Sequence, residues 1–249
     1  MIAMIFAAGL GTRLKPITDH MPKALVPVSG KPLLEIQIKK LYEAGVRKVI
    51  INVHHFSQQI VDYIRQHPFK DMSYIISDES DKLLDTGGGL KKAMRLLGEN
   101  EKGQPLIVHN VDILDNADFS GFYNQYQTGV DALLMVSNRQ TKRYFLFDEN
   151  NRLVGWTNIE TGEVKTPFPQ LNVESCKKMA FAGMHLVTEN VANAMSSCPD
   201  KFGITDFYIS QCARLCIKGY SQTGFQMVDV GKLDTLRQAE KFYEKFYKV

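Results

Sequence analysis

Apolar runs in the first half of the chain predict strands that are buried on both faces. Residues 1–7 are continuously apolar, and residues 46–53, which follow Gly45, contain the apolar segment VII and predict a buried strand. Residues 73–76 and 105–112 have the same character. Short apolar runs between turn signals are typical of the strands of a parallel sheet.

Stretches with helical spacing lie between these runs. Residues 32–44 place apolar side chains three and four positions apart and end at Gly45. Ser57 is a candidate N-cap for a second helix, and residues 90–97 predict a third. Strands that alternate with amphipathic helices indicate a parallel sheet with right-handed crossovers.

The second half of the chain alternates less regularly. Residues 144–147 and 152–156 flank the sequence DENN and predict an antiparallel hairpin. Residues 157–176 predict a loop or an insertion. Two further helices are expected over residues 205–216 and 233–246.

These elements together predict the α/β fold class. We expect a three-layer, mostly parallel Rossmann-like sheet with helices on both faces and a small antiparallel hairpin in the second half. No repeat, low-complexity segment or linker divides the sequence, so a single domain over residues 1–249 is expected. In such sheets the ligand binds beyond the carboxyl ends of the strands.

The composition excludes several classes of function. Of 249 residues, 44% are hydrophobic and 23% are charged, as in ordinary soluble proteins. The net charge of +3 is too small to indicate nucleic acid or a membrane as a partner. The apolar start is too short for a signal peptide or a membrane span, so we expect a cytoplasmic protein. Cys212 and Cys216 lie one helical turn apart, but nothing nearby completes a zinc site.

A glycine-rich loop, AAGLGTRLKPITDHMPKALVP, follows the first predicted strand. Its backbone N–H groups could hold phosphate oxygens, and Gly9 and Gly11 allow a ligand to approach closely. Leu14 stands where the dinucleotide fingerprint needs a third glycine, and the Walker A sequence is missing. Arg13 and Lys23 offer the positive charge that transfer at phosphorus requires. On these features alone, a solvated surface loop remains an equal alternative.

The longer pattern of this loop resembles the signature of the sugar-1-phosphate nucleotidyltransferases. That signature is G-x-G-x-R-L-x-P-hydrophobic-T, followed after a gap by P-K-x-hydrophobic-x-P. The matching positions are Gly9, Gly11, Arg13, Leu14, Pro16, Ile17, Thr18, Pro22, Lys23, Leu25 and Pro27. Ala24 stands where the family usually has proline. The resemblance implies that Arg13 and Lys23 contact the triphosphate and the transferred phosphate. It implies nucleotide contacts for Ala8, Gly9, Gly11 and Thr12.

A second segment, LLDTGGG at residues 83–89, resembles the family stretch that lies against the nucleotide base. This resemblance implies base contacts for Asp85 and Gly88, because glycine allows backbone groups to meet a flat base edge. Glu79 lies just before the segment and could also reach the base. The same residues are compatible with the N-terminus of a helix.

Two carboxylates match family positions and predict a magnesium site. Asp112 follows a predicted strand in VHNVD, where the family usually has Gly-Asp instead of Val111 and Asp112. Asp229 lies in VDVGKLDTL, which resembles the family sequence D-x-G-T with Lys232 in place of threonine. Mg²⁺ prefers oxygen ligands, so Asp112 and Asp229 could share one ion between the phosphates.

The sugar side of the site matches the family less closely. AFAGMH, which contains Gly183, resembles the segment that lines the family's sugar pocket, although a glycine in a strand often marks a bulge. Val111 is expected beside the sugar phosphate. The family's Glu-Lys-Pro motif is missing, and the choice of a substitute stays open among Lys165, Lys177 and Lys178.

The resemblance covers nearly the whole chain and implies an activity. It is greatest for the branch that contains N-acetylmuramate 1-phosphate uridylyltransferases and mannose-1-phosphate guanylyltransferases. The expected reaction transfers a nucleoside monophosphate from a triphosphate to a sugar 1-phosphate and releases pyrophosphate, with Mg²⁺ as cofactor, in a monomer or small homo-oligomer. We expect a uridylyl- or guanylyltransferase that acts on a hexose-type 1-phosphate. Phosphocholine cytidylyltransferase activity and a non-catalytic nucleotide-sugar-binding regulator remain alternatives.

Overall fold

The structure is a computed structural model that describes residues 1–248. The chain forms two compact units, and each consists of separate segments of sequence. Unit 1 contains Met1–Leu83, Leu106–Phe122 and the segment that begins at Gln226. Unit 2 contains Leu84–Pro105 and Tyr123–Phe225. No helix within residues 1–248 is long and apolar enough to cross a membrane.

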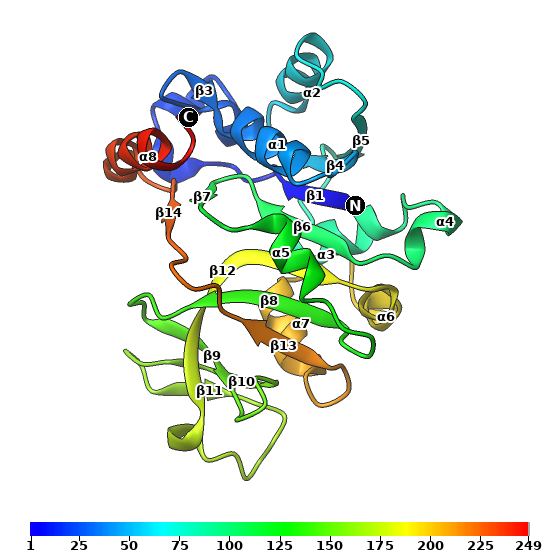
Figure 1. The fold of residues 1–249 in the computed structure, drawn as a ribbon, viewed down its shortest axis with the longest axis vertical. Coiled ribbons are helices and arrows are strands. Elements are labelled where there is room, and N and C mark those ends of the chain that lie inside the picture. The colour runs from blue at the N-terminus through cyan, green and yellow to red at the C-terminus, as the bar shows by residue number, and fades with distance from the viewer. Residues whose placement is uncertain (249) are drawn as a thin grey trace. The chain divides into compact units, whose positions relative to one another are not determined.

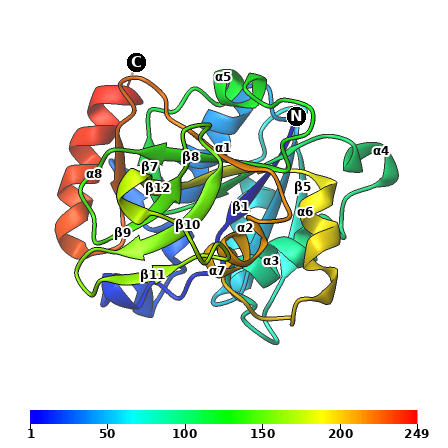
Figure 2. The ribbon, with the colours of Figure 1, turned by 90° about the horizontal axis from the view of Figure 1, so that it is seen from below.

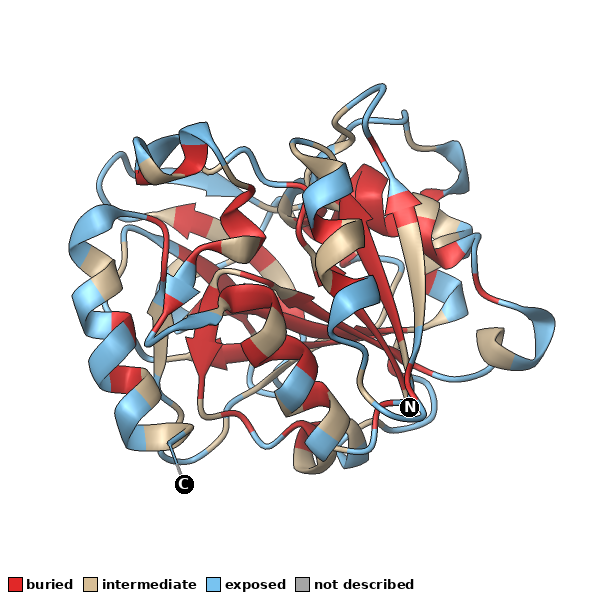
Figure 3. Ribbon diagram, turned by 90° about the horizontal axis from the view of Figure 1, so that it is seen from above, coloured by how far each residue is buried: buried red, intermediate tan, exposed pale blue. Residues whose placement is uncertain are grey.

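Unit 1 is built on a parallel sheet with the strand order β6-β1-β4-β5 (Figure 1). Both β1 and β4 are buried along almost their whole length, which explains their continuous apolar sequences (Figure 3). The segments that follow β1 and β6 lie at the same edge of the sheet, because parallel strands end on the same side. The strands are β1 (Ile2–Phe6), β4 (Lys48–Val53), β5 (Ser73–Asp78) and β6 (Leu106–Asn110).

Helices connect the strands of unit 1 as the sequence pattern predicts. The N-cap of α2 is Phe56, in the left-handed region with φ 53°, so the prediction of Ser57 as the cap was wrong by one residue. The helices are α1 (Leu33–Glu43), α2 (Ser57–Gln66), α5 (Phe119–Asn124, which continues into unit 2) and α8 (Leu233–Phe246). Three single 3₁₀ turns are η1 (Thr12–Leu14), η2 (Ile17–Asp19) and η3 (Lys23–Leu25).

Two short antiparallel ladders complete unit 1. One joins β2 (Pro27–Val28) to β3 (Lys31–Pro32). The other joins β7 (Ile113–Asp115) to β14 (Met227–Asp229) and therefore brings together segments that are far apart in the sequence. The C-terminal helix α8 packs against β14 and β7 (Figure 1).

Unit 2 contains a mostly antiparallel sheet with the order β11-β10-β9-β12-β8-β13. Its strands β9, β10 and β11 are labelled in Figure 2. Only the β13–β8 pair is parallel among these strands. The predicted hairpin is confirmed as β9 and β10, and the predicted loop over residues 157–176 contains β11. The strands are β8 (Ala132–Ser137), β9 (Arg143–Phe147), β10 (Leu153–Asn158), β11 (Glu163–Lys165), β12 (Lys177–Val187) and β13 (Ile217–Tyr220).

The helices of unit 2 differ from the prediction mainly at their ends. The helix expected over residues 90–97 is α3, which begins at Asp85 and ends at Met94. Two of its glycines, Gly87 and Gly88, allow close packing against residues 200–202, which outweighs their poor helix propensity. The helix expected over residues 205–216 is α7, which ends at Gln211. The helices are α3 (Asp85–Met94), α4 (Glu99–Lys102), α6 (Glu189–Ala194) and α7 (Ile204–Gln211), with 3₁₀ turns η4 (Val173–Ser175) and η5 (Met195–Ser197).

The predicted fold class is confirmed. Parallel central strands alternate with helices in unit 1, and the hairpin belongs to the antiparallel part in unit 2. The antiparallel part is larger than predicted, because the buried strand β8 and the short strand β13 were not recognised in the sequence.

Gly88 allows the closest packing in α3 and gives a stability prediction. A Cβ atom at this position would lie 1.9 Å from the carbonyl oxygen of Asp200. Gly88→Ala should therefore lower the free energy of unfolding by about 1–3 kcal/mol, despite the better helix propensity of alanine. Urea unfolding measures the change. Gly103→Ala is the control, because no atom lies within 4 Å of its Cβ position and its φ is −74°. Equal stability of the two variants would contradict the packing argument.

Candidate active site

The loop after β1 is held by a turn that only glycine fits well. Gly11 has φ 65°, and a Cβ atom there would lie 2.9 Å from Cγ2 of Thr18. The Thr18 hydroxyl donates a hydrogen bond to the Gly11 carbonyl oxygen at 2.9 Å. Gly9 is exposed, and no atom lies within 4 Å of its Cβ position. The loop is therefore fixed at Gly11 and leaves open space at Gly9.

The structure brings Lys23 and Asp112 together. The Lys23 ammonium forms an ion pair with the Asp112 carboxylate, across 89 residues of sequence. The Lys23 side chain is 8% exposed and that of Asp112 is 24% exposed, so the pair is partly shielded from water. The electrostatic interaction within a shielded ion pair is stronger than within a surface pair, because water screens it less.

The β7–β14 ladder places Asp229 next to Asp112. Asp229 is aligned with Ile113, the residue that follows Asp112. The N–H of Val230 donates to the carbonyl oxygen of Asp112 at 2.8 Å. Two carboxylate-bearing segments that are far apart in sequence are thus neighbours in the backbone of unit 1.

Arg13 lies beside Asp229. The Cβ position of Gly231 is 2.7 Å from Oδ1 of Asp229 and 2.8 Å from Nη2 of Arg13. The side chains of Arg13 and Asp229 therefore both lie next to Gly231. A larger residue at position 231 would need the same space. Arg13 and Asp229 are exposed, so this basic and acidic pair is accessible to a ligand.

Glu79 is buried rather than on the surface. Its side chain is 2% exposed and accepts a hydrogen bond from Nδ2 of Asn52 at 2.8 Å. The other end of the Asn52 amide accepts from the N–H of Ala7 at 2.8 Å. Asn52 therefore links Glu79 to the end of β1, a role that the sequence reasoning missed. A polar residue in the apolar sequence KVIINV was the available signal.

The remaining predicted residues of unit 1 lie around the same sheet edge. Ala8 is buried and Thr12 is exposed at the start of η1. Val111 is 3% exposed, and its N–H donates to the Phe6 carbonyl oxygen at 3.1 Å. Val111 therefore joins the ends of β1 and β6, and any effect of its side chain on a ligand would act through the backbone.

Three predicted residues lie in unit 2. Asp85 is exposed, and its carboxylate accepts from the N–H of Thr86 at 2.6 Å. Gly88 packs against residue 200, and its N–H faces the carbonyl oxygen of Phe202 at 3.3 Å. Gly183 lies with φ 76° where the β12–β8 register shifts, which is the bulge that the sequence suggested.

A cavity of about 460 Å³ in unit 2 is lined by basic and aromatic side chains. Lys165 lines it, whereas Lys177 and Lys178 do not. Lys165 is paired with Asp206 at 3.2 Å and lies 5.3 Å from the Trp156 ring centre. The basic and aromatic side chains of the lining are Arg139, Arg143, Phe145, Trp156, Lys165 and Phe181.

Arg143 is the available cation of this cavity. Within residues 1–248 its guanidinium has no hydrogen-bond or ion-pair partner, whereas Arg139 donates to the Phe181 carbonyl oxygen at 3.2 Å. Glu163 and Asp206 both lie near Lys165, so that lysine is neutralised. An unpaired arginine beside aromatic rings suits a ligand that combines an anionic group with a ring.

The donor set in unit 1 suits Mg²⁺ bound together with a substrate. No group of three or more His, Cys, Asp or Glu side chains that could hold a metal occurs in the described residues. Asp112 and Asp229 would supply two oxygen ligands. Mg²⁺ commonly binds through one or two carboxylates and completes its shell with substrate phosphates and water.

A larger cavity of about 840 Å³ in unit 1 does not contain the candidate residues. It lies between α1, α8 and the segment after β7, and none of Arg13, Lys23, Asp112 or Asp229 lines it. Its charged side chains are paired with one another, as for Lys31 and Glu35 at 2.7 Å. Size alone therefore does not identify it as the active site.

Comparison with protein families identifies the family of the chain. A family profile described as "Nucleotidyl transferase" matches residues 2–148, more than half of the chain. The chain belongs to the nucleotidyl transferase family. The sequence prediction of a sugar-1-phosphate nucleotidyltransferase relationship is thereby confirmed.

Individual relatives of this nucleotidyl transferase family member match only part of the chain. An N-acetylmuramate alpha-1-phosphate uridylyltransferase of Caulobacter vibrioides is 43% identical over 113 residues, or 45% of each protein. A choline-phosphate cytidylyltransferase of Streptococcus pneumoniae is 52% identical over 66 residues, or 26% of this chain and 28% of that one. The match thus spans less than half the length of each relative.

The fold is shared over nearly the whole chain. The crystal structure of HddC from Yersinia pseudotuberculosis, complexed with GMP-PN, has a TM-score of 0.74. The superposition covers 97% of this chain and 99% of that one at 19% sequence identity. The similarity shows a common fold for both.

Proposed function

We propose that the protein transfers a nucleoside monophosphate from a nucleoside triphosphate to a sugar 1-phosphate and releases pyrophosphate. The observation that carries the proposal is the β7–β14 ladder, which makes Asp112 and Asp229 neighbours. The Lys23 ammonium pairs with Asp112, and Arg13 lies beside Asp229. Two anions and two cations at one sheet edge suit a reaction between two phosphorylated substrates.

The proposed reaction is one direct displacement. A phosphate oxygen of the sugar 1-phosphate attacks the α-phosphorus, a new P–O bond forms, and the bond to the leaving pyrophosphate breaks. The Arg13 guanidinium binds phosphate oxygens, and the Lys23 ammonium stabilises the negative charge that develops on the leaving group. No covalent intermediate is needed, so no nucleophilic side chain is required.

We propose Mg²⁺ as the cofactor, held by Asp112 and Asp229. When bound, it screens the repulsion between the two anionic substrates and the developing charge. Asp112 also holds Lys23 in place, because the ion pair orients the ammonium group. Arg13 and Asp229 similarly share the space beside Gly231.

We propose that the cavity of unit 2 takes the acceptor and that Arg143 selects one with a second anionic group. The unpaired guanidinium of Arg143 and the Trp156 and Phe145 rings support this assignment. N-acetylmuramate 1-phosphate, the substrate named for the Caulobacter relative, carries such a carboxylate. Uridine triphosphate is accordingly the expected nucleotide.

The rival acceptor is phosphocholine, which the Streptococcus relative's name suggests. A choline cation would need an open aromatic face with nearby carboxylates. In this cavity the Lys165 ammonium already lies over the Trp156 ring, and both nearby carboxylates face Lys165. The arrangement therefore favours the anionic acceptor.

A pyrophosphate-release screen tests the activity. Each of the four common triphosphates is combined with glucose 1-phosphate, mannose 1-phosphate, N-acetylmuramate 1-phosphate and phosphocholine. We expect the highest kcat/KM for uridine triphosphate with N-acetylmuramate 1-phosphate. Turnover of cytidine triphosphate with phosphocholine alone would establish the rival, and nucleotide-sugar binding without turnover would indicate a regulator.

Arg143→Ala tests the acceptor assignment. Losing charge-assisted hydrogen bonds should raise KM for an acceptor that carries a carboxylate by about tenfold to a hundredfold. KM for glucose 1-phosphate, which lacks that group, should stay unchanged. Lys142→Ala is the control, because the neighbouring Lys142 is exposed and paired with Glu160 at 2.6 Å. An equal rise in KM for both acceptors would contradict the assignment.

We propose a cytoplasmic enzyme that works as a monomer or small homo-oligomer on two small substrates, without nucleic acid or membrane. All four cysteines are unpaired in the structure, which suits a reducing compartment.

A further inference from the structure

Two side chains of α1 donate hydrogen bonds to the short strand β7. Nε2 of Gln37 donates to the Ile113 carbonyl oxygen, and the Lys40 ammonium donates to the Asp115 carbonyl oxygen at 2.7 Å. Gln37 is fully buried, and Lys40 lies three residues later on the same face of the helix. Both ends of β7 are therefore bound to α1.

The Asp115 carboxylate is the centre of this arrangement. Its side chain is 1% exposed and forms an ion pair with the Lys40 ammonium. It lies 2.7 Å from Nε2 of His109 and accepts from the N–H of Ala117 at 2.8 Å. Burial alone would raise the pKa of Asp115, but Lys40 and His109 hold that pKa well below its usual range. Asp115 therefore stays ionised in the interior.

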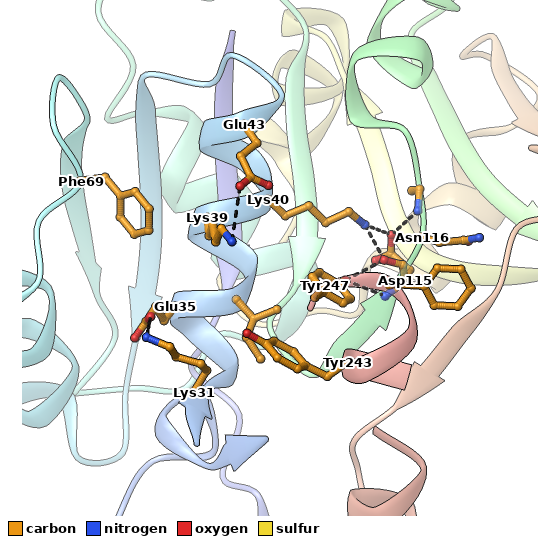
Figure 4. A pocket seen from close by; sticks show the side chains of 13 residues that line it. Lys31, Glu35, Lys39, Lys40, Glu43, Phe69, Asp115, Asn116, Tyr243 and Tyr247 are labelled. Atoms are coloured by element: carbon orange, nitrogen blue, oxygen red, sulfur yellow. Dashed lines mark hydrogen bonds and ion pairs between the residues drawn. The ribbon is translucent and has the colours of Figure 1, made fainter. Parts of the chain in front are cut away.

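Tyr247, which follows α8, also forms hydrogen bonds with β7. Its hydroxyl donates to the Asp115 carbonyl oxygen at 2.6 Å and accepts from the Asp115 N–H at 3.2 Å. Figure 4 shows Lys40 and Tyr247 approaching Asp115 from different elements at the wall of the large cavity. Side chains from α1 and α8 thus meet at one residue of β7.

These contacts bear directly on the two candidate metal ligands. β7 has three residues; Asp112 precedes it, and Asp229 is aligned with its first residue. So short a ladder contributes few backbone hydrogen bonds of its own to fix its position. The side chains at Ile113 and Asp115 must therefore supply much of the positional restraint.

We propose that Gln37, Lys40, Asp115 and Tyr247 are positioning residues that hold β7 where Asp112 and Asp229 converge. They touch neither substrate nor metal in this role. The inference rests on the proposed function, since it concerns the same reaction. It differs from a purely structural role, which would change thermal stability and leave the rate of the folded enzyme intact.

Tyr247→Phe is the mildest test, because it removes one hydroxyl and leaves no buried charge unpaired. We expect kcat to fall by about tenfold, with KM for the triphosphate within about twofold, since small misplacements of reacting groups are costly. Tyr243→Phe is the matched control: Tyr243 stacks on Tyr247 at 5.6 Å and makes no hydrogen bond to β7.

The double variant Lys40→Met/Asp115→Asn removes the buried ion pair as a whole. Replacing both charges together keeps the interior neutral, so the variant is expected to fold. Lys39→Met is its control, because Lys39 is exposed and lies 3.5 Å from Glu43. Isothermal titration of a triphosphate with and without Mg²⁺ provides a readout independent of turnover, and melting curves report folding.

The expected result is a folded double variant with kcat reduced by roughly a hundredfold and a lost or weakened effect of Mg²⁺ on nucleotide binding. Normal kcat and normal Mg²⁺ dependence in folded Tyr247→Phe and double variants would overturn the positioning role. If the wild-type enzyme is active and both variants have the same kcat and Mg²⁺ dependence, only this inference is refuted. A wild-type protein without turnover on any substrate overturns the proposed function, and this inference with it.

Discussion

Asp112→Asn and Asp229→Asn should each remove almost all turnover while the protein remains folded. Asparagine has the same size as aspartate but lacks the charge that would hold Mg²⁺ in the proposed site. Losing metal stabilisation of several kcal/mol corresponds to a rate decrease of about a thousandfold. In Asp112→Asn the Lys23 ammonium also loses its partner. Pyrophosphate release at a series of Mg²⁺ concentrations measures the effect.

Asp234→Asn is the control for this pair of variants. Asp234 is exposed in the first turn of α8, five residues after Asp229, and is not aligned with β7. Its removal should leave kcat within about twofold, because surface charges have small effects. Full wild-type activity in excess chelator would refute the assignment of both carboxylates as metal ligands.

Lys23→Ala should lower kcat by about a hundredfold and affect KM for the triphosphate much less. In the proposed reaction the negative charge near Lys23 is greatest as pyrophosphate leaves, so the contact should be worth more in the transition state than in the ground state. The low exposure of the side chain increases the effect, since little water can replace the ammonium. Steady-state kinetics with both substrates varied separates kcat from KM.

Lys15→Ala is the comparison for Lys23. Lys15 belongs to the same loop, its side chain is 60% exposed, and it pairs with Asp19 at 2.8 Å. We expect almost normal kinetics for this variant. If Lys23→Ala instead raised only KM, Lys23 would be a binding residue without a role in the chemical step.

The regular elements could be predicted because their patterns are local. The helix over residues 233–246 has the predicted bounds, since its apolar face and its length are both visible in the sequence. The buried strands β1 and β4 were evident from continuous apolar runs. The start of α3 was not, because the glycines are helical only through contacts with residues 200–202.

The convergence of site residues could be predicted only in part. Family resemblance selected Asp112 and Asp229, but their adjacency depends on a ladder of three residues with no distinctive pattern. Similarly, the contacts of Gln37 with Ile113 and of Lys40 with Asp115 join residues that lie 75 or more positions apart. Local periodicity carries no information about such distant hydrogen bonds.

The segmented construction of unit 1 has a consequence for synthesis on the ribosome. Unit 2 is complete once Phe225 has been translated, because all its segments precede that residue. Unit 1 still lacks the strand that carries Asp229 and the hydroxyl of Tyr247. Because chains fold as they emerge, a nascent chain can finish unit 2 before β14 aligns Asp229 with β7. The proposed site at Asp112 and Asp229 is therefore assembled only after β14 has left the exit tunnel.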